Sequence, residues 1–177
     1  MATKTNKELL QELNFKLDKV LAILEQREIK HTVISCDGSI TKNPGGQCAI
    51  GVVIEIPGKA DIEIARIVPR SSTNNEAEMD AIYEGLSTIS KLQVAPGKRA
   101  PGSNKIEIVS DSQVVVNGLT GKYSLQAEGL ARRKEFINEL VSQIQADVVF
   151  TWKERNSTPG LNRANELAQT INGVEPH

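Results

Sequence analysis

Three acidic residues, Asp37, Glu78 and Asp111, stand in segments whose neighbours predict burial. Asp37 ends the apolar run 33–36, and Asp111 follows the run 106–110. Either aspartate alone could be a turn or cap residue, but an ionised carboxylate inside a fold is costly without a partner. Hard divalent cations take oxygen ligands and relieve the repulsion between neighbouring carboxylates. If the three groups converge, the chemistry to expect is metal-assisted hydrolysis.

Glu78 belongs to a helix that we expect to run from Thr73 or Asn74 to about Ser90. At roughly 100° per residue, Glu78 falls on the apolar face of this helix, which comprises Ile82, Gly85, Leu86 and Ile89. The opposite side carries Glu76, Asp80 and Glu84, which we expect to form a solvated face. Glu78 therefore needs a metal ion or a buried cation as its partner, whereas the other three acids do not.

Alternating apolar residues predict the elements that must position these acids. We expect three antiparallel strands at 31–36, 47–56 and 61–68, joined by the turn signals Asn43-Pro44-Gly45-Gly46 and Pro57-Gly58. After the helix come a parallel strand at 105–109, helices from Gln113 and at about 125–145, a strand at 147–153 and a helix at about 161–172. Ligand sites of open α/β sheets lie at the carboxyl ends of parallel strands, so this order should bring the three acids together.

The N-terminal residues form a separate element in this interpretation. Residues 5–29 contain no Gly or Pro and carry apolar residues at alternating spacings of three and four, namely Leu10, Leu13, Leu17, Val20 and Leu24. This heptad-like pattern predicts a helical arm over residues 1–30. The arm could pack on its own domain or form a homodimer. The predicted organisation is therefore the arm, a domain at 31–172 and a tail at 173–177.

The composition limits the other function classes. The formal net charge is −1 and the pI about 6.2, so binding of a nucleic acid would have to come from local patches rather than from a strong basic field. Two cysteines, Cys36 and Cys48, offer no disulfide framework and are expected to be reduced core thiols of a cytoplasmic protein. The N-terminus lacks the pattern of a signal peptide, and no apolar stretch is long enough to span a bilayer. We therefore expect no membrane partner.

Four motifs occur in a fixed order along the chain. They are Asp37-Gly38-Ser39 followed by Asn43-Pro44-Gly45, then Thr73-Asn74-Asn75 with Glu78 three residues later, then Ser110-Asp111-Ser112-Gln113, and finally the stretch 151–168, which ends in Asn162-Arg163-Ala164-Asn165-Glu166-Leu167-Ala168. Each motif alone is weak. Together and in register they resemble the type 1 ribonuclease H family, over about residues 31–172.

The resemblance implies an α/β fold with a five-stranded mixed sheet, three antiparallel strands and then parallel ones, flanked by helices. It implies two Mg²⁺ or Mn²⁺ ions and endonucleolytic cleavage of the RNA strand of an RNA/DNA hybrid. Asp37 would bridge both ions, and Glu78 and Asp111 would hold one of them. The substrate-binding positions it implies are Gly38, Ser39, Asn43, Thr73, Asn74, Asn75, Gln113 and Arg155. Among these, the amides would reach the minor groove and the RNA 2′-hydroxyl, and Thr73 a DNA phosphate.

Two positions depart from the family pattern. A fourth carboxylate is usual on the last helix, and Asn165 stands there; its amide oxygen can still bind a metal ion but brings no charge, so affinity for the second ion should fall. Glu166 is a poor substitute because it points about 100° further round the helix. Arg155 occupies the position of a flexible-loop histidine. Arginine does not titrate near neutral pH but can hold a phosphate.

Three alternatives stay open beside the active hybrid-specific enzyme. The two departures suit a domain that binds hybrid or duplex nucleic acid with little cleavage. Another member of the same broad fold, an exonuclease or a recombinase, is a further candidate, although a proofreading-type exonuclease should carry an Asp-x-Glu pair where this chain has Ser39. The last alternative is a structural module that dimerises through residues 5–29.

Overall fold

Five strands form one mixed sheet in the computed structural model, which describes residues 10, 12–16, 30–69, 71–92 and 104–173. The elements in chain order are β1 (Thr32–Ile40), β2 (Cys48–Glu55), β3 (Ile62–Ile67), α2 (Asn74–Leu92), β4 (Lys105–Ser110), α3 (Gln113–Leu119), α4 (Glu128–Gln143), β5 (Asp147–Trp152) and α5 (Pro159–Ile171). The strand order is β3-β2-β1-β4-β5. The first three strands are antiparallel, and β1, β4 and β5 run parallel, which confirms the expected fold class.

The central strand β1 is longer than the sequence predicted. It continues through Asp37 to Ile40, because it stays paired with β2 as far as the pair Ile40 and Cys48. Its parallel pairing with β4 stops earlier, at Cys36 and Ser110. Asp37 therefore lies inside β1 and not at its end. From Asp37 onward, the side of β1 that faces β4 has no strand partner, which leaves a notch in the sheet.

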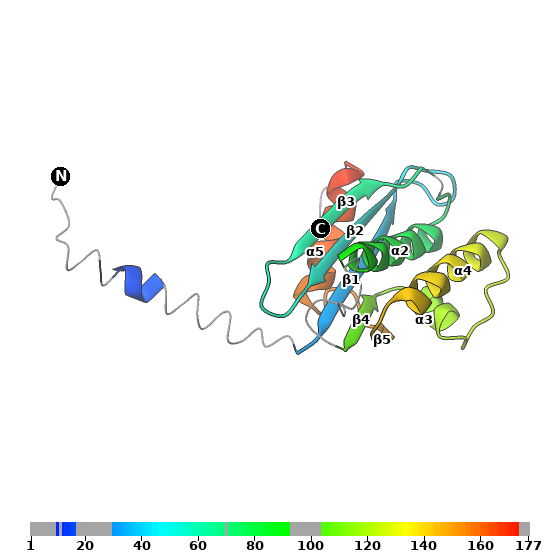
Figure 1. The fold of residues 1–177 in the computed structure, drawn as a ribbon. Helices are drawn as coiled ribbons and strands as arrows, with labels where there is room; N and C mark the ends of the chain where they lie inside the picture. The colour runs from blue at the N-terminus through cyan, green and yellow to red at the C-terminus, as the bar shows by residue number, and fades with distance from the viewer. Residues whose placement is uncertain (1–9, 11, 17–29, 70, 93–103, 174–177) are drawn as a thin grey trace.

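Helices cover the sheet on both faces (Figure 1). Helix α2 packs against β1 and β2, with α4 beside it, and α5 packs against β1, β2 and β3 on the other face. Two glycines permit the close approach. A Cβ atom on Gly38 would lie 2.5 Å from the backbone nitrogen of Glu78, and one on Gly51 would lie 1.8 Å from the carbonyl oxygen of Ala164. Because successive residues of a strand point to opposite faces and Gly51 is paired with Asp37, Asp37 faces α5 while Gly38 faces α2.

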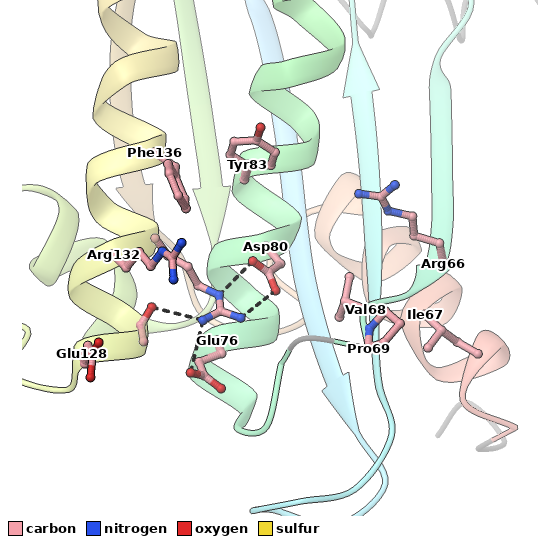
Figure 2. Close-up of a pocket in the computed structure, with 12 residues that line it drawn as sticks. Arg66, Ile67, Val68, Pro69, Glu76, Asp80, Tyr83, Glu128, Arg132 and Phe136 are labelled. Atoms are coloured by element: carbon pink, nitrogen blue, oxygen red, sulfur yellow. Dashed lines mark hydrogen bonds and ion pairs between the residues drawn. The ribbon is translucent and has the colours of Figure 1, made fainter.

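The prediction of a solvated face on α2 is wrong, because α4 covers part of that face. The Arg133 guanidinium of α4 donates from Nε to Asp80 Oδ1 at 2.9 Å and from Nη1 to Glu76 Oε1 at 3.2 Å. Glu84 forms an ion pair with Arg66 of β3. The close-up of the groove between β3, α2 and α4 shows Glu76 and Asp80 directed toward α4 (Figure 2). The three charges are thus paired with arginines from neighbouring elements, Glu76 and Asp80 with α4 and Glu84 with β3.

Helix α4 begins at Glu128, three residues later than expected. Leu125 lies outside it and packs against the core, with Cδ2 2.5 Å from where a Cβ of Gly118 would stand. The cap residue Ala127 is extended, and the helix starts only after it. The remaining ends of helices and strands lie within about two residues of the prediction, which is the usual uncertainty of such boundaries.

Little of the predicted N-terminal arm lies among the described residues. Residues 10 and 12–16 are helical, and Leu10, Leu13 and Phe15 are about 60% exposed. Leu17, Val20 and Leu24, on which the heptad pattern depends, and the tail residues 174–177 lie outside the described residues. Dimerisation through the arm stays a prediction. Over the described ranges, none of the helices combines the length and apolar character needed to cross a bilayer. Cys36 and Cys48 are buried free thiols.

Candidate active site

The three acids singled out in the sequence meet at the notch in the sheet. Asp37, Glu78 and Asp111 each offer a carboxylate oxygen, and these atoms all lie within 4.8 Å of one another. Asp37 and Glu78 are 1% exposed, and the Asp111 side chain is also largely buried. Three segments separated by more than thirty residues thus form one anionic cluster.

The notch explains how acids from both sides of the sheet can meet. Glu78 arrives from the α2 side, and its carboxylate accepts hydrogen bonds from the Gly38 backbone N–H and, at 3.3 Å, from Ser110 Oγ. The Gly38 N–H is available because β4 has already ended at Ser110. Asp111 follows that strand end directly, and Ser112 then caps α3, with its side chain accepting from the Val115 backbone nitrogen.

Ionisation of these carboxylates is unfavourable as long as no cation is bound among them. Burial, and next the charge of Asp111, raise the pKa of Asp37 to about 7, although the Arg155 guanidinium lowers it. Burial, and then the charges of Asp37 and Asp111, raise the pKa of Glu78 well above its usual range. Asp37 Oδ2 is buried and has no hydrogen-bond partner. Close carboxylates with an unpaired oxygen are the donor set that a hard divalent cation requires, so these residues fit such an ion.

Arg155 reaches into the same cluster from the segment between β5 and α5. Its Nε donates to Asp111 Oδ2 at 2.8 Å, and Nη2 lies 3.5 Å from Asp37 Oδ1. These bonds raise the pKa of Arg155, so its charge is permanent at any working pH. The Arg155 side chain is 54% exposed, so it contacts the two aspartates from the solvent side of the cluster. Arg155 thus joins the buried acids to the exposed edge of the cluster.

Asn165 lies on α5 near the level of Asp37 in the sheet, since the preceding residue, Ala164, packs on Gly51 opposite Asp37. Its side chain is half-buried, and Oδ1 accepts a hydrogen bond from Gln169 Nε2 at 2.9 Å. Helix α5 is held in place by Thr158, which caps it by accepting from the Leu161 backbone nitrogen. The amide oxygen of Asn165 is thus hydrogen-bonded to a residue one turn further along the same helix.

The other residues expected to contact a substrate occupy β1, the β1–β2 turn and the starts of α2 and α3. Gly38 and Ser39 follow Asp37 in β1, Asn43 is exposed in the β1–β2 turn, and Gln113 is exposed at the start of α3. A hydrogen bond from the Gly45 nitrogen to the Ser72 carbonyl, at 2.9 Å, ties the β1–β2 turn to the start of α2.

Thr73, Asn74 and Asn75 are half-buried at the start of α2. Thr73 Oγ1 accepts from the Glu76 backbone nitrogen, while the Glu76 carboxylate accepts from the backbone nitrogens of Ser72 and Thr73. This reciprocal pair is a capping box, with Thr73 as the cap residue. It fixes the first turn of α2, which carries the two asparagines and leads directly to Glu78.

The sequence analysis missed two residues of the site. Ser110 supports the Glu78 carboxylate, and Trp152 donates from Nε1 to the Asp111 carbonyl oxygen at 3.0 Å. The available signal was position: Ser110 ends β4, and Trp152 ends the neighbouring strand β5. The register that pairs the two residues was not readable from periodicity.

Comparisons with known proteins agree with this geometry. The family model described as RNase H matches residues 29–171. A ribonuclease H of Caldicellulosiruptor saccharolyticus is 27% identical over 156 residues, covering 81% of this chain and 97% of that protein. RNase H1 of the halophilic archaeon Halobacterium salinarum is 27% identical with a TM-score of 0.67, covering 81% of this chain and 98% of that one.

LC11-RNase H1, solved in complex with an RNA/DNA hybrid, is 23% identical with a TM-score of 0.67 and covers 80% of this chain and 97% of that one. At this identity the likeness shows the fold. The family model, by contrast, spans all five strands and the three converging acids. The chain therefore belongs to the RNase H family of enzymes.

Proposed function

We propose that this chain is a metal-dependent endonuclease that hydrolyses the RNA strand of RNA/DNA hybrids with two divalent ions, Mg²⁺ or Mn²⁺. The observation that supports it most directly is the cluster of Asp37, Glu78 and Asp111 within 4.8 Å, with one buried oxygen of Asp37 unpaired. The structure of LC11-RNase H1 with a bound hybrid supports the class of substrate. The catalytic domain would be residues 31–172.

Each acid has its own part in the proposed mechanism. Asp37 would contribute to holding both ions, Glu78 and Asp111 would hold one of them, and Asn165 would be a neutral fourth ligand. When bound, the ions supply an activated water and stabilise the leaving oxygen. Gly38 N–H and Ser110 Oγ keep the Glu78 carboxylate oriented, so the ligand does not have to reorganise. A protein nucleophile is not required, and the products are a 5′-phosphate and a 3′-hydroxyl.

Polar side chains around the acids would read the hybrid. The amides of Asn43, Asn74, Asn75 and Gln113 can both donate to and accept from the RNA 2′-hydroxyl, which distinguishes RNA from DNA. Thr73 would contact a DNA phosphate and Arg155 the phosphate nearest the metal ions. Gly38 and Ser39 would line the path of the cleaved strand along β1.

The substrate is tested by incubating the protein with end-labelled RNA/DNA hybrid, RNA duplex, DNA duplex and single-stranded RNA, each with Mg²⁺, Mn²⁺ or EDTA. We expect cleavage of the RNA in the hybrid alone, and none in EDTA. Tight binding of the hybrid without cleavage in either metal would contradict an active enzyme. It would favour the second candidate, a weakened binding domain, which the missing charge at Asn165 supports.

Restoring the charge on α5 tests the role of Asn165. Asn165→Asp should lower the Mg²⁺ concentration for half-maximal activity by roughly tenfold, because a carboxylate binds a hard cation more strongly than an amide does. The rate at limiting Mg²⁺ should rise accordingly. Glu166→Asp on the same helix is the control, since Glu166 pairs with Arg163 instead. Equal Mg²⁺ dependence of the Asn165→Asp variant and the native chain would remove Asn165 from the ligand set.

Arg155 should act on metal and substrate in opposite directions. Its guanidinium competes with cations for Asp37 and Asp111, so Arg155→Ala should lower the half-saturating Mg²⁺ concentration by roughly two- to fivefold, the range of an exposed ion pair. The same change should raise KM for the hybrid, because a phosphate contact is lost. Arg163→Ala, which breaks ion pairs with Glu63 and Glu166, serves as the control. An Arg155→Ala variant with unchanged KM would refute the phosphate contact.

A further inference from the structure

Trp152 is fixed against the backbone of one of the three acids. It ends β5 in register with Ser110, and its indole Nε1 donates to the carbonyl oxygen of Asp111 at 3.0 Å. The next residue continues the connection, since the Lys153 backbone nitrogen donates to the Ser110 carbonyl at 3.1 Å. The ring therefore cannot turn away from Asp111 without losing its only polar bond to the site.

The same side chain is 41% exposed, although its donor is satisfied. Exposed aromatic surface is unfavourable in water at about 25 cal/mol per Å². A polar residue would be tolerated at the exposed end of a strand, so the fold does not require a tryptophan there. Tryptophan with a fixed polar handle and a free apolar surface is typical of residues that contact a partner. Since the handle is on Asp111, any such partner would lie beside the acid cluster.

We infer that Trp152 is a substrate contact, and that its ring packs against the sugar of the RNA-strand nucleotide adjacent to the scissile phosphate. This inference rests on the proposed function. In a duplex the faces of the bases are already stacked on one another, so the apolar C–H surface of a backbone sugar is the part that an aromatic ring can cover. The contact adds no charge, so it strengthens substrate binding without competing with the cations that Asp37, Glu78 and Asp111 attract.

The chain offers a direct probe of this contact, because Trp152 is its one tryptophan. Intrinsic fluorescence is measured while hybrid is added to the Asp37→Asn variant, in which cleavage is blocked. We expect a shift of the emission maximum and about a twofold loss of acrylamide quenching when the hybrid saturates the protein. Emission and quenching that stay constant, while anisotropy of a labelled hybrid reports binding, would overturn the inference.

Two substitutions separate a substrate contact from a support for Asp111. Trp152→Leu should raise KM for the hybrid by about tenfold, the equivalent of covering roughly 55 Å² of apolar surface at about 25 cal/mol per Å², with little change in the Mg²⁺ dependence. Trp152→Phe keeps a ring but loses the donor to Asp111, and should recover most of that affinity. Phe136→Leu is the matched control, an exposed aromatic residue in the groove between α2 and α4 (Figure 2).

The possible outcomes are distinct. If the Leu and Phe variants lose activity equally, through kcat and the Mg²⁺ requirement and with unchanged KM, Trp152 only positions Asp111 and the inference is wrong. If the native chain neither binds nor cleaves any hybrid, the proposed function fails and this inference fails with it. Hybrid cleavage by the native chain, together with a raised KM for Trp152→Leu alone, supports both.

Discussion

Asp37→Asn should abolish hybrid cleavage, lowering kcat by about a thousandfold or more, the effect of losing several kcal/mol of transition-state stabilisation. A carboxylate oxygen of Asp37 lies within 4.8 Å of those of Glu78 and Asp111, and Asp37 Oδ2 is buried without a hydrogen-bond partner among the described residues. An amide in its place offers one neutral oxygen and cannot bridge two cations. The measurement is kcat on a labelled hybrid at saturating Mg²⁺.

A folding defect must be separated from this loss of chemistry. Asn is nearly isosteric with Asp and removes a buried charge that has two acidic neighbours, so the metal-free variant should be at least as stable as the native chain. The control is Asp147→Asn, an exposed aspartate at the start of β5. Activity of Asp37→Asn within tenfold of the native chain, in a protein that is fully folded, would remove Asp37 from the catalytic set.

Stability without metal should fall as the pH rises from about 4 to about 7. The pKa of Asp37 is raised to about 7 from its ordinary value of 3.8, so the folded state holds a proton that the unfolded state has already lost. The pKa of Glu78 is raised in the same direction. The decrease in the free energy of unfolding over this pH range should be on the order of 4 kcal/mol. It is measured by denaturant unfolding in EDTA at a series of pH values.

Mg²⁺ should reverse this decrease. A ligand that binds only the folded state stabilises it by about 2.7 kcal/mol at a hundred times its dissociation constant, so Mg²⁺ should raise stability strongly at pH 8 and weakly at pH 5. Asp37→Asn should flatten the pH dependence and remove most of the Mg²⁺ effect. Metal-free stability that is constant or increases between pH 4 and pH 7 would contradict the raised pKa of the buried acids.

The sequence predicted the type and order of the elements well, because apolar periodicity reports which face of a strand or helix is buried. Every strand and helix expected after His31 is present, in the expected mixed sheet. The predicted boundaries were wrong where a contact with a distant segment decides where an element starts or ends. Strand β1 extends past Asp37 because β2 continues to pair with it, and α4 begins late because Leu125 packs on Gly118.

The solvated face expected for Glu76 and Asp80 failed for the same reason. A helical wheel shows which residues share a side of one helix, but it contains no information about a second helix that covers that side. Arg133 lies more than fifty residues further along the chain. Its charge was visible in the sequence, but the crossing of α4 over α2 that makes it a partner was not.

The sequence by itself determined the acids Asp37, Glu78 and Asp111, the burial of Glu78, and the substitutions at Asn165 and Arg155, because these depend on residue type and local spacing. Only the tertiary structure decided how the acids meet. Strand β4 ends one residue before Asp111, and the resulting notch lets carboxylates from the two faces of the sheet come within 4.8 Å. The positions of Ser110, Arg155 and Trp152 around that notch follow from strand register and loop path, which are set by long-range pairing rather than by local sequence.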